Sequence, residues 1–480
     1  MKKNILVFLL LASLSIVSCN KEYLETAPTS DVAEAYIFKS LTGAQTLLEG
    51  IHRFGYASGS PEHDRFGHKS IDYAIDCLGE DFYSNERGYG WFVAWYQYLV
   101  HRNVNAGNCL YPWDFYYDII NNANLLLANI DNITVFESEI PRRNNIKAQA
   151  LVYRAHSHYQ LVQMYASRYN WETKINTQLG IPIRLTPSQD PIARSTVDEV
   201  YAQIKKDLTD AIVLLNGNTA SRLNISHIHL NTANAIAARV ALTTGDWTNA
   251  VSYARAARTG TALEANYNYG FNKVSTEWIW GAVLIDEQQT TYRSFFSHID
   301  PVFQGYATLG NHKLISTVVF DFMSSTDTRK EAFKTTAGKP RVGWKFTGGG
   351  KMTNDYLYIK AGEMYLIEAE AEARRGNTID AQNVLFTLIN KRDPAYVKTT
   401  LSGDDLINHI LLHRRADLWG EGQRFFDIKR LNIALDRRDL GHNSALWNAA
   451  SNFAPGDKNF VFLIPQQEMD SNPLMVQNPL

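Results

Sequence analysis

Aromatic and planar polar residues gather in two stretches of the chain that lack a helical pattern. The 480 residues include 25 tyrosines, 22 phenylalanines and 10 tryptophans, and many of them fall within 79–98 and 278–306. The apolar C–H face of a sugar ring lies flat on Trp or Tyr, while its hydroxyl groups need planar partners such as Asn and Arg. The candidates for such binding are Arg87, Tyr89, Trp91, Trp95 and Tyr96 in the first stretch and Tyr292, Phe295 and Tyr306 in the second.

The same side chains have an alternative role, which is to anchor the loops that carry them. For the first stretch the residue types do not decide between the two roles. Trp278 and Trp280 alternate around Ile279, so both point to one face of a predicted strand, where we expect packing. Trp113, Trp247 and Trp419 lie in helix-packing patterns and are expected to be structural.

Patterns that would carry catalysis or hold a cofactor are missing from the sequence. GGGKM at 348–352 is no phosphate loop, because Met follows the Lys and the earlier Gly is lacking. There is no Gly-x-Ser-x-Gly elbow, no His-Glu-x-x-His helix and no Cys pair at metal-ligand spacing. His156 and His158 are two residues apart on a helix, so we expect one packed and one solvated. The sequence therefore indicates no catalytic residue, metal ligand or cofactor, and it leaves open whether a metal ion is bound.

Neighbouring carboxylates leave one enzymatic alternative open. Glycosidases use two carboxyl groups whose separation is spatial, so pairs such as Glu80 with Asp81 or Asp404 with Asp405 are formal candidates. With 49 acidic residues in the chain, such pairs are expected by chance. We therefore rank a glycosidase last.

The N-terminus has the features of a bacterial lipoprotein signal. Lys2 and Lys3 precede an apolar run over 5–17, and Ser18 stands directly before Cys19. The run is too short for a membrane span. Cleavage of residues 1–18 would leave the thiol of Cys19 to take a lipid and serve as the anchor.

Charge and the remaining cysteines restrict the partners and leave one question open. The formal net charge is −2, and this near-balance argues against a nucleic-acid partner, which would need a basic face. After lipidation only Cys77 and Cys109 remain. In an exported protein they can form a disulfide or stay as two buried thiols, and the spacing does not decide.

Two helical hairpins organise the rest of the chain. Alanines at i, i+3, i+4 spacing lie on either side of Gly245, and a similar arrangement surrounds Gly376. Small faces let two helices approach closely, and a short glycine turn makes them antiparallel. The spacing resembles the tetratricopeptide hairpin, yet the two glycines are too far apart for a uniform array.

Further amphipathic stretches complete a predominantly α-helical prediction. Thr196 and Glu199 have capping-box spacing before a clean helical stripe. We predict one domain over 19–480, with helical pairs roughly at 36–260 and 354–435 and a loop-rich, partly β lobe roughly at 264–351.

Several motifs, in order along most of the chain, resemble the SusD/RagB family of outer-membrane nutrient-binding lipoproteins. The helical stripe from Trp113 to Asn124 is one of them, and LWGEGQRFFDIKR at 418–430 is similar to the family's Glu-Gly-x-Arg-x-x-Asp helix. His413 departs from the pattern, because an acidic residue often precedes the Arg pair there. The other motifs are the lipidated start with Tyr23, Leu24 and Pro28, GIP at 180–182, RSTV at 194–197, IPQQE at 464–468 and the Asn-Pro pairs at 472–473 and 478–479.

The resemblance implies a tetratricopeptide-like superhelix with a variable lobe, displayed on the outer membrane through its lipid. It also implies a protein without covalent chemistry that binds an oligosaccharide and closes over a SusC-like TonB-dependent transporter. A peptide or glycopeptide ligand is the alternative within the family, and a helical-repeat scaffold for protein partners is the alternative outside it. The sequence does not identify the ligand.

Overall fold

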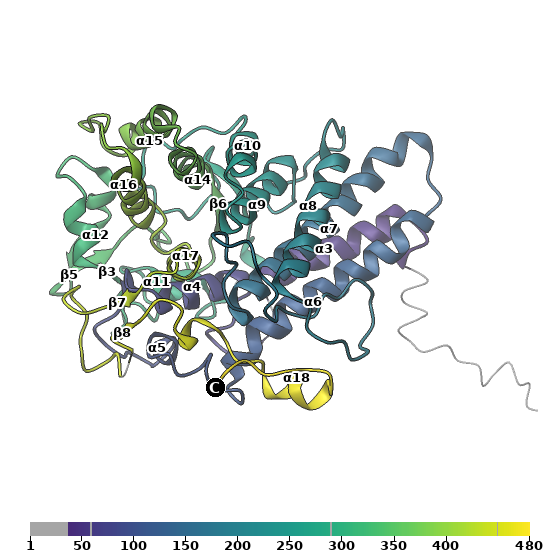
Figure 1. Ribbon diagram of the computed structural model, residues 1–480, viewed down its shortest axis with the longest axis horizontal. Coiled ribbons are helices and arrows are strands. Elements are labelled where there is room, and N and C mark those ends of the chain that lie inside the picture. The colour runs from purple at the N-terminus through teal and green to yellow at the C-terminus, as the bar shows by residue number, and fades with distance from the viewer. Residues whose placement is uncertain (1–36, 58–59, 289, 449) are drawn as a thin grey trace, which may run out of the picture.

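The computed structural model describes residues 37–57, 60–288, 290–448 and 450–480, so the predicted lipid anchor at Cys19 lies outside it. The fold is predominantly α-helical, as predicted (Figure 1). No helix in these ranges is both long and apolar enough to cross a membrane. The long helices are α3 (Leu41–Tyr56), α4 (His68–Leu78), α6 (Gly107–Asn129), α7 (Ile140–Tyr165), α8 (Val197–Leu215), α9 (Leu230–Thr243), α10 (Trp247–Ala257), α14 (Ala361–Arg374), α15 (Thr378–Arg392), α16 (Gly403–Asp417) and α17 (Arg424–Leu431).

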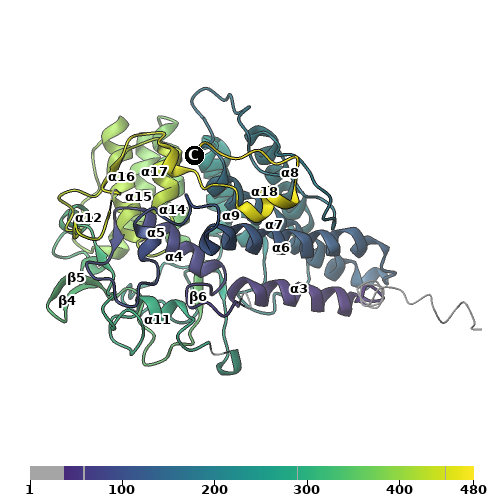
Figure 2. The ribbon, with the colours of Figure 1, turned by 90° about the horizontal axis from the view of Figure 1, so that it is seen from below.

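The helices pack as successive antiparallel pairs in a tetratricopeptide-like superhelix. α6, α7 and α8 lie side by side on one half of the molecule with α3 alongside, and α14, α15 and α16 gather on the other half (Figures 1 and 2). The α9–α10 pair stands between them, and α10 packs on α14. Thr196 caps α8 in the predicted box with Glu199.

The two predicted hairpins are confirmed at α9–α10 and α14–α15. Gly245 has φ +67° and Gly376 φ +81°, the left-handed conformation that ends a helix without a Cβ clash. In each turn the following residue's N–H reaches back to a carbonyl of the first helix, from Asp246 to Ala241 at 2.9 Å and from Asn377 to Glu372 at 2.9 Å. The alanine faces beside the turns are buried.

Small strands and short helices lie both within 264–351, the stretch that the sequence predicted as a loop-rich lobe, and outside it. An antiparallel four-stranded sheet has the order β1-β3-β5-β4, and β2 pairs with β6 and β7 with β8. The strands are β1 (Phe82–Tyr83), β2 (Trp278–Ala282), β3 (Leu314–Ile315), β4 (Phe333–Thr336), β5 (Lys339–Gly343), β6 (Tyr356–Lys360), β7 (Leu435–Asp436) and β8 (Asn452–Phe453). The short helices are α5 (Val93–Tyr96), α11 (Phe295–Ile299), α12 (Thr317–Phe322), α13 (Thr328–Glu331) and α18 (Gln466–Ser471).

Buried ion pairs tie the motif at 418–430 to the rest of the fold. Glu421, 2% exposed, accepts from both Lys345 and Lys360. Arg430 donates to Glu370 at 2.7 Å and to Asp427 at 2.7 Å. Because such charges would be costly without partners, the motif's residue types are explained by structure.

The structure shows how deeply three pairs of side chains considered in the sequence analysis are buried, namely two histidines, two cysteines and two tryptophans. His156 and His158 are both buried, so the expectation of one solvated ring is wrong, because α7 packs against α3, α6, α8 and α9 and has no solvated face there. Cys77 and Cys109 are both free and buried. Trp278 and Trp280 are buried in the core, as expected.

Candidate functional site

The first aromatic loop is held at its base by ion pairs from the helical half. Arg415 of α16 donates to both carboxylate oxygens of Asp81 at 2.7 Å each, and Arg424 of α17 donates to Glu80 at 2.9 Å. The indole N–H of Trp419 donates to the Asp81 carbonyl at 2.8 Å. These bonds fix where the chain leaves α4, and therefore where the residues after 82 stand.

The two aromatic loops meet each other directly. Gly88 has φ +49°, and a Cβ at this position would lie 3.0 Å from the carbonyl oxygen of Gly310. Glycine permits both the backbone conformation and the close approach. The amide of Asn311 donates to the carbonyl of Trp91 at 3.3 Å. The loops are thus joined close to the residues predicted to bind ligand.

Four of the predicted binding residues form one cluster around Tyr306. The ring centroid of Tyr306 lies 5.5 Å from that of Tyr89, 5.3 Å from that of Tyr292 and 6.0 Å from that of Trp91. Tyr89 is 69% exposed and Tyr292 39%, while Trp91 and Tyr306 are half-buried. We refer to Tyr89, Trp91, Tyr292 and Tyr306 as the aromatic cluster. It offers rings in several orientations to one region of the surface.

Two histidines that no sequence pattern marks support the cluster. The ring of His63 stacks on Trp91 at 5.5 Å with an interplanar angle of 15°, and its Nδ1 lies 2.5 Å from the Tyr306 hydroxyl. His298 stacks on Tyr306 from the core side at 5.0 Å. Burial lowers the pKa of His298 to about 3, so this imidazole is neutral at physiological pH. His63 stands alone in a polar turn, and no periodicity or motif marks it.

Polar groups adjoin the aromatic cluster. Arg87 is exposed, and its carbonyl accepts from the Gly90 N–H at 2.8 Å in the turn that carries Tyr89. Next to Tyr292, Arg293 shares with Arg53 and Arg65 an open polar hollow of about 280 Å³. Arg87 and Arg293 thus carry hydrogen-bond donors close in the sequence to Tyr89 and Tyr292.

The other three predicted binding residues lie in the core. Trp95 is 3% exposed, Tyr96 6% and Phe295 1%. Tyr96 bonds through its hydroxyl to His442 at 2.8 Å, with the Arg437 guanidinium over its ring. They serve the anchoring role that the sequence left as the alternative, because α5 and α11 turn these side chains inward. We therefore leave them out of the site.

The paired carboxylates do not form a catalytic pair. Glu80 and Asp81 are buried and bound to arginines as described above. Asp404 and Asp405 are exposed in the first turn of α16, where negative charge favours the helix dipole. Structural roles therefore account for both pairs, as ion-pair partners in the first case and as charges at a helix start in the second.

Comparisons with known proteins agree over most of the chain. A family model described as "Starch-binding associating with outer membrane" matches residues 67–242, and the model of the SusD family matches residues 324–480. The SusD-like protein P2 of Formosa agariphila is 24% identical over the full length of both chains.

Solved structures show the same fold. A SusD-like carbohydrate-binding protein from Bacteroides vulgatus has a TM-score of 0.80 at 25% identity, with 91% of this chain and 97% of that chain covered. A SusD superfamily protein from Bacteroides thetaiotaomicron has a TM-score of 0.78 at 25% identity, with 92% and 100% covered. The two family models together match most of the sequence, and the solved relatives share its fold, so the chain belongs to the SusD/RagB family.

Proposed function

We propose that this protein is a surface lipoprotein of the outer membrane that binds an oligosaccharide at the aromatic cluster. The lipid on Cys19 holds it on the membrane, and the bound sugar passes to a partner TonB-dependent transporter. Members of the family are binding proteins, and the first solved relative above is named for binding carbohydrate. The observation that carries the proposal is the convergence of four aromatic residues from two distant loops around Tyr306.

The chemistry of the cluster suits a sugar that is held and then released. Exposed Tyr and Trp rings accept the C–H faces of pyranoses, and the nearby arginines can bond hydroxyl or carboxylate groups. Each stacked ring contributes about 1 kcal/mol beyond buried area, so two or three rings give roughly millimolar to micromolar affinity. A protein that passes its ligand onward needs affinity in this range.

Two alternatives have less support from the arrangement. A peptide site would favour exposed Leu or Phe side chains and a free strand edge, whereas this site consists of Tyr and Trp on loops. A protein scaffold would expose the inner faces of its helices. Here the alanine faces of α9 and α10 are buried.

Calorimetric titration of the soluble protein beginning after Cys19 tests the proposal. The panel contains neutral oligosaccharides, uronate-containing oligosaccharides and peptides. Tyr89→Ala and Tyr292→Ala are expected to weaken sugar binding by about 5-fold each, because each removes one stacked ring. Phe136→Ala is the matched control, since Phe136 is an aromatic residue 79% exposed beyond the end of α6 and should not affect binding.

Sugar binding that is equal in both tyrosine variants and the wild type would refute the site. Binding of peptides alone would refute the oligosaccharide and favour the alternative ligand. The membrane part has its own test, in which Cys19→Ala moves the protein from the outer-membrane fraction to the soluble fraction. Recovery of a β-barrel transporter with the lipidated protein, but not with unrelated lipoproteins, would support the transporter partner.

A further inference from the structure

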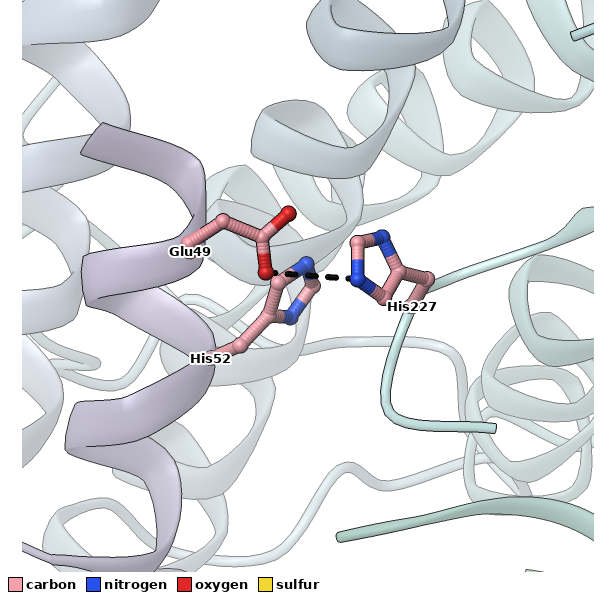
Figure 3. Close-up of side chains that lie close together, drawn as sticks. All are labelled: Glu49, His52 and His227. Atoms are coloured by element: carbon pink, nitrogen blue, oxygen red, sulfur yellow. Dashed lines mark ion pairs between the residues drawn. The ribbon is translucent and has the colours of Figure 1, made fainter. Parts of the chain in front are cut away.

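Three potential metal ligands converge where α3 meets the loop before α9. Glu49 and His52 are three residues apart on α3, so they share one face of the helix. His227 comes from the loop between α8 and α9, and its side chain points toward the other two (Figure 3). Among the residues that the structure describes, this is the one group of three His, Cys, Asp or Glu side chains close enough to share an ion.

The ligand atoms are already near the spacing that a metal ion requires. Each side chain offers one atom, and all three atoms lie within 4.8 Å of one another. His227 Nε2 is 3.2 Å from Glu49 Oε2. Zinc bonds of about 2.0–2.2 Å in a tetrahedron place ligand atoms about 3.3 Å apart, so the widest gap has to close by at most about 1.5 Å. Small side-chain rotations achieve this, because the two imidazole centroids are only 4.4 Å apart.

One atom of the group has no hydrogen-bond partner. His52 is 7% exposed, and its Nδ1 bonds the Tyr153 hydroxyl at 2.5 Å. Its other ring nitrogen, Nε2, is buried without a partner. A buried polar atom left unsatisfied destabilises a fold, so it calls for an explanation. Metal-bound histidines usually bond a second group through the ring nitrogen that does not face the ion, which is the arrangement of His52 with Tyr153.

We propose that Glu49, His52 and His227 bind a divalent transition-metal ion of the zinc class, with a water molecule in the fourth position. Two imidazoles and one carboxylate suit Zn²⁺ and its neighbours, whereas Ca²⁺ and Mg²⁺ prefer sites built from oxygen ligands. The side chain of Glu49 is 42% exposed, so the fourth position lies on the solvent side.

The ion would fasten the first long helix to the loop that leads into the central hairpin. α3 otherwise packs on α6 and α7 through its apolar face. The loop is attached to α7 by the Ile228 N–H, which donates to Gln149 at 2.9 Å. A metal bridge from His227 to Glu49 and His52 therefore joins three helical layers at one point. The expected role is structural.

Metal analysis and calorimetry of untagged protein, stripped with a chelator and titrated with ZnCl₂, test this assignment. One equivalent of Zn²⁺ is expected to bind and to raise the melting temperature, while CaCl₂ and MgCl₂ do neither. Glu49→Gln and His227→Gln each remove a ligand and should weaken Zn²⁺ affinity at least about 100-fold, since loss of outer-shell partners alone costs 10–100-fold. Tyr153→Phe removes only the bond to His52 and should weaken affinity about 10-fold.

His409→Gln is the matched control. His409 lies with its Nε2 3.2 Å from that of His413, so this variant removes an imidazole from another close histidine pair. It is expected to keep wild-type Zn²⁺ affinity. Glu49 is half-exposed, so Glu49→Gln keeps the test valid if a histidine variant misfolds. Failure of the wild type to bind one equivalent, or full affinity in Glu49→Gln, would overturn the proposal.

Discussion

Replacing Arg154 on α7 or Asp207 on α8 alone is expected to destabilise the protein more than replacing both. Arg154 Nε and one terminal nitrogen donate to the two Asp207 oxygens at 2.8 and 2.7 Å. The two side chains are 10% and 1% exposed. Arg154 also donates to Asn124 of α6 at 3.0 Å, and Gln203 donates to Asp207 at 2.8 Å. The pair therefore links three helices from within the core.

The magnitude follows from what each variant leaves behind. Arg154→Met leaves the Asp207 carboxylate buried with one neutral donor, and Asp207→Leu leaves a guanidinium with one neutral acceptor. Removing one partner of a buried pair costs about 3–5 kcal/mol. The double variant leaves no charge, only an unpaired Asn124 acceptor and Gln203 donor, so it should cost about 2 kcal/mol. Additive effects would instead give roughly 8 kcal/mol.

Urea denaturation followed by circular dichroism gives the free energy of unfolding of the wild type, the two single variants and the double variant at one pH. The dependence of this free energy on urea concentration should have the same slope in all four. Asp210→Leu, on the same helix, is the control, because its partner Lys206 is 65% exposed and such surface pairs contribute less than about 1 kcal/mol. A double variant as unstable as the sum of the singles would refute the reasoning. A loss of free energy of unfolding in Asp207→Leu no larger than that in Asp210→Leu would also refute it.

Three further predictions concern stability. Gly245→Ala places a Cβ 2.6 Å from that of Trp171 in a left-handed residue with φ +67°. It should therefore lower the free energy of unfolding more than Gly376→Ala, where the space is open and left-handed strain alone costs about 1–2 kcal/mol. Urea midpoints compare the two variants. Thr196→Ala removes the cap of α8 and should lower the free energy of unfolding by about 1 kcal/mol in the same assay. An unchanged free energy would contradict a stabilising role of the Thr196–Glu199 capping box. Burial lowers the pKa of Lys429 to about 7 from 10.5. Its contribution to stability is therefore complete above pH 10.5 and lost as the pH falls through 7. The free energy of unfolding should rise with pH across this window, and Lys429→Met should reduce that slope by up to about 1.4 kcal/mol per pH unit. An unchanged pH slope would refute it.

Local patterns in the sequence predicted the helical architecture correctly where neighbours along the chain decide the structure. The alanine faces and the glycines at 245 and 376 specify antiparallel hairpins through close packing and the left-handed turn. The Thr196–Glu199 box marks a helix start by hydrogen bonds that span three residues. The loss of helical periodicity at 79–98 correctly marked a loop. These features need no distant contact.

The same patterns could not separate Tyr89 and Trp91 from Trp95 and Tyr96, which have the same chemistry within eight residues. The separation depends on long-range contacts. Arg415 and Arg424 hold the loop base, and α5 then turns its aromatics into the core.

The sequence by itself determined the two alanine-faced hairpins, their glycine turns and the cap of α8, because periodicity and capping act between residues close in the chain. Only the tertiary structure decided which aromatics meet at Tyr306 and that His227 joins Glu49 and His52. These groups come from segments far apart in sequence. Their meeting is fixed by the packing and buried charges of the whole fold, and no local pattern encodes it.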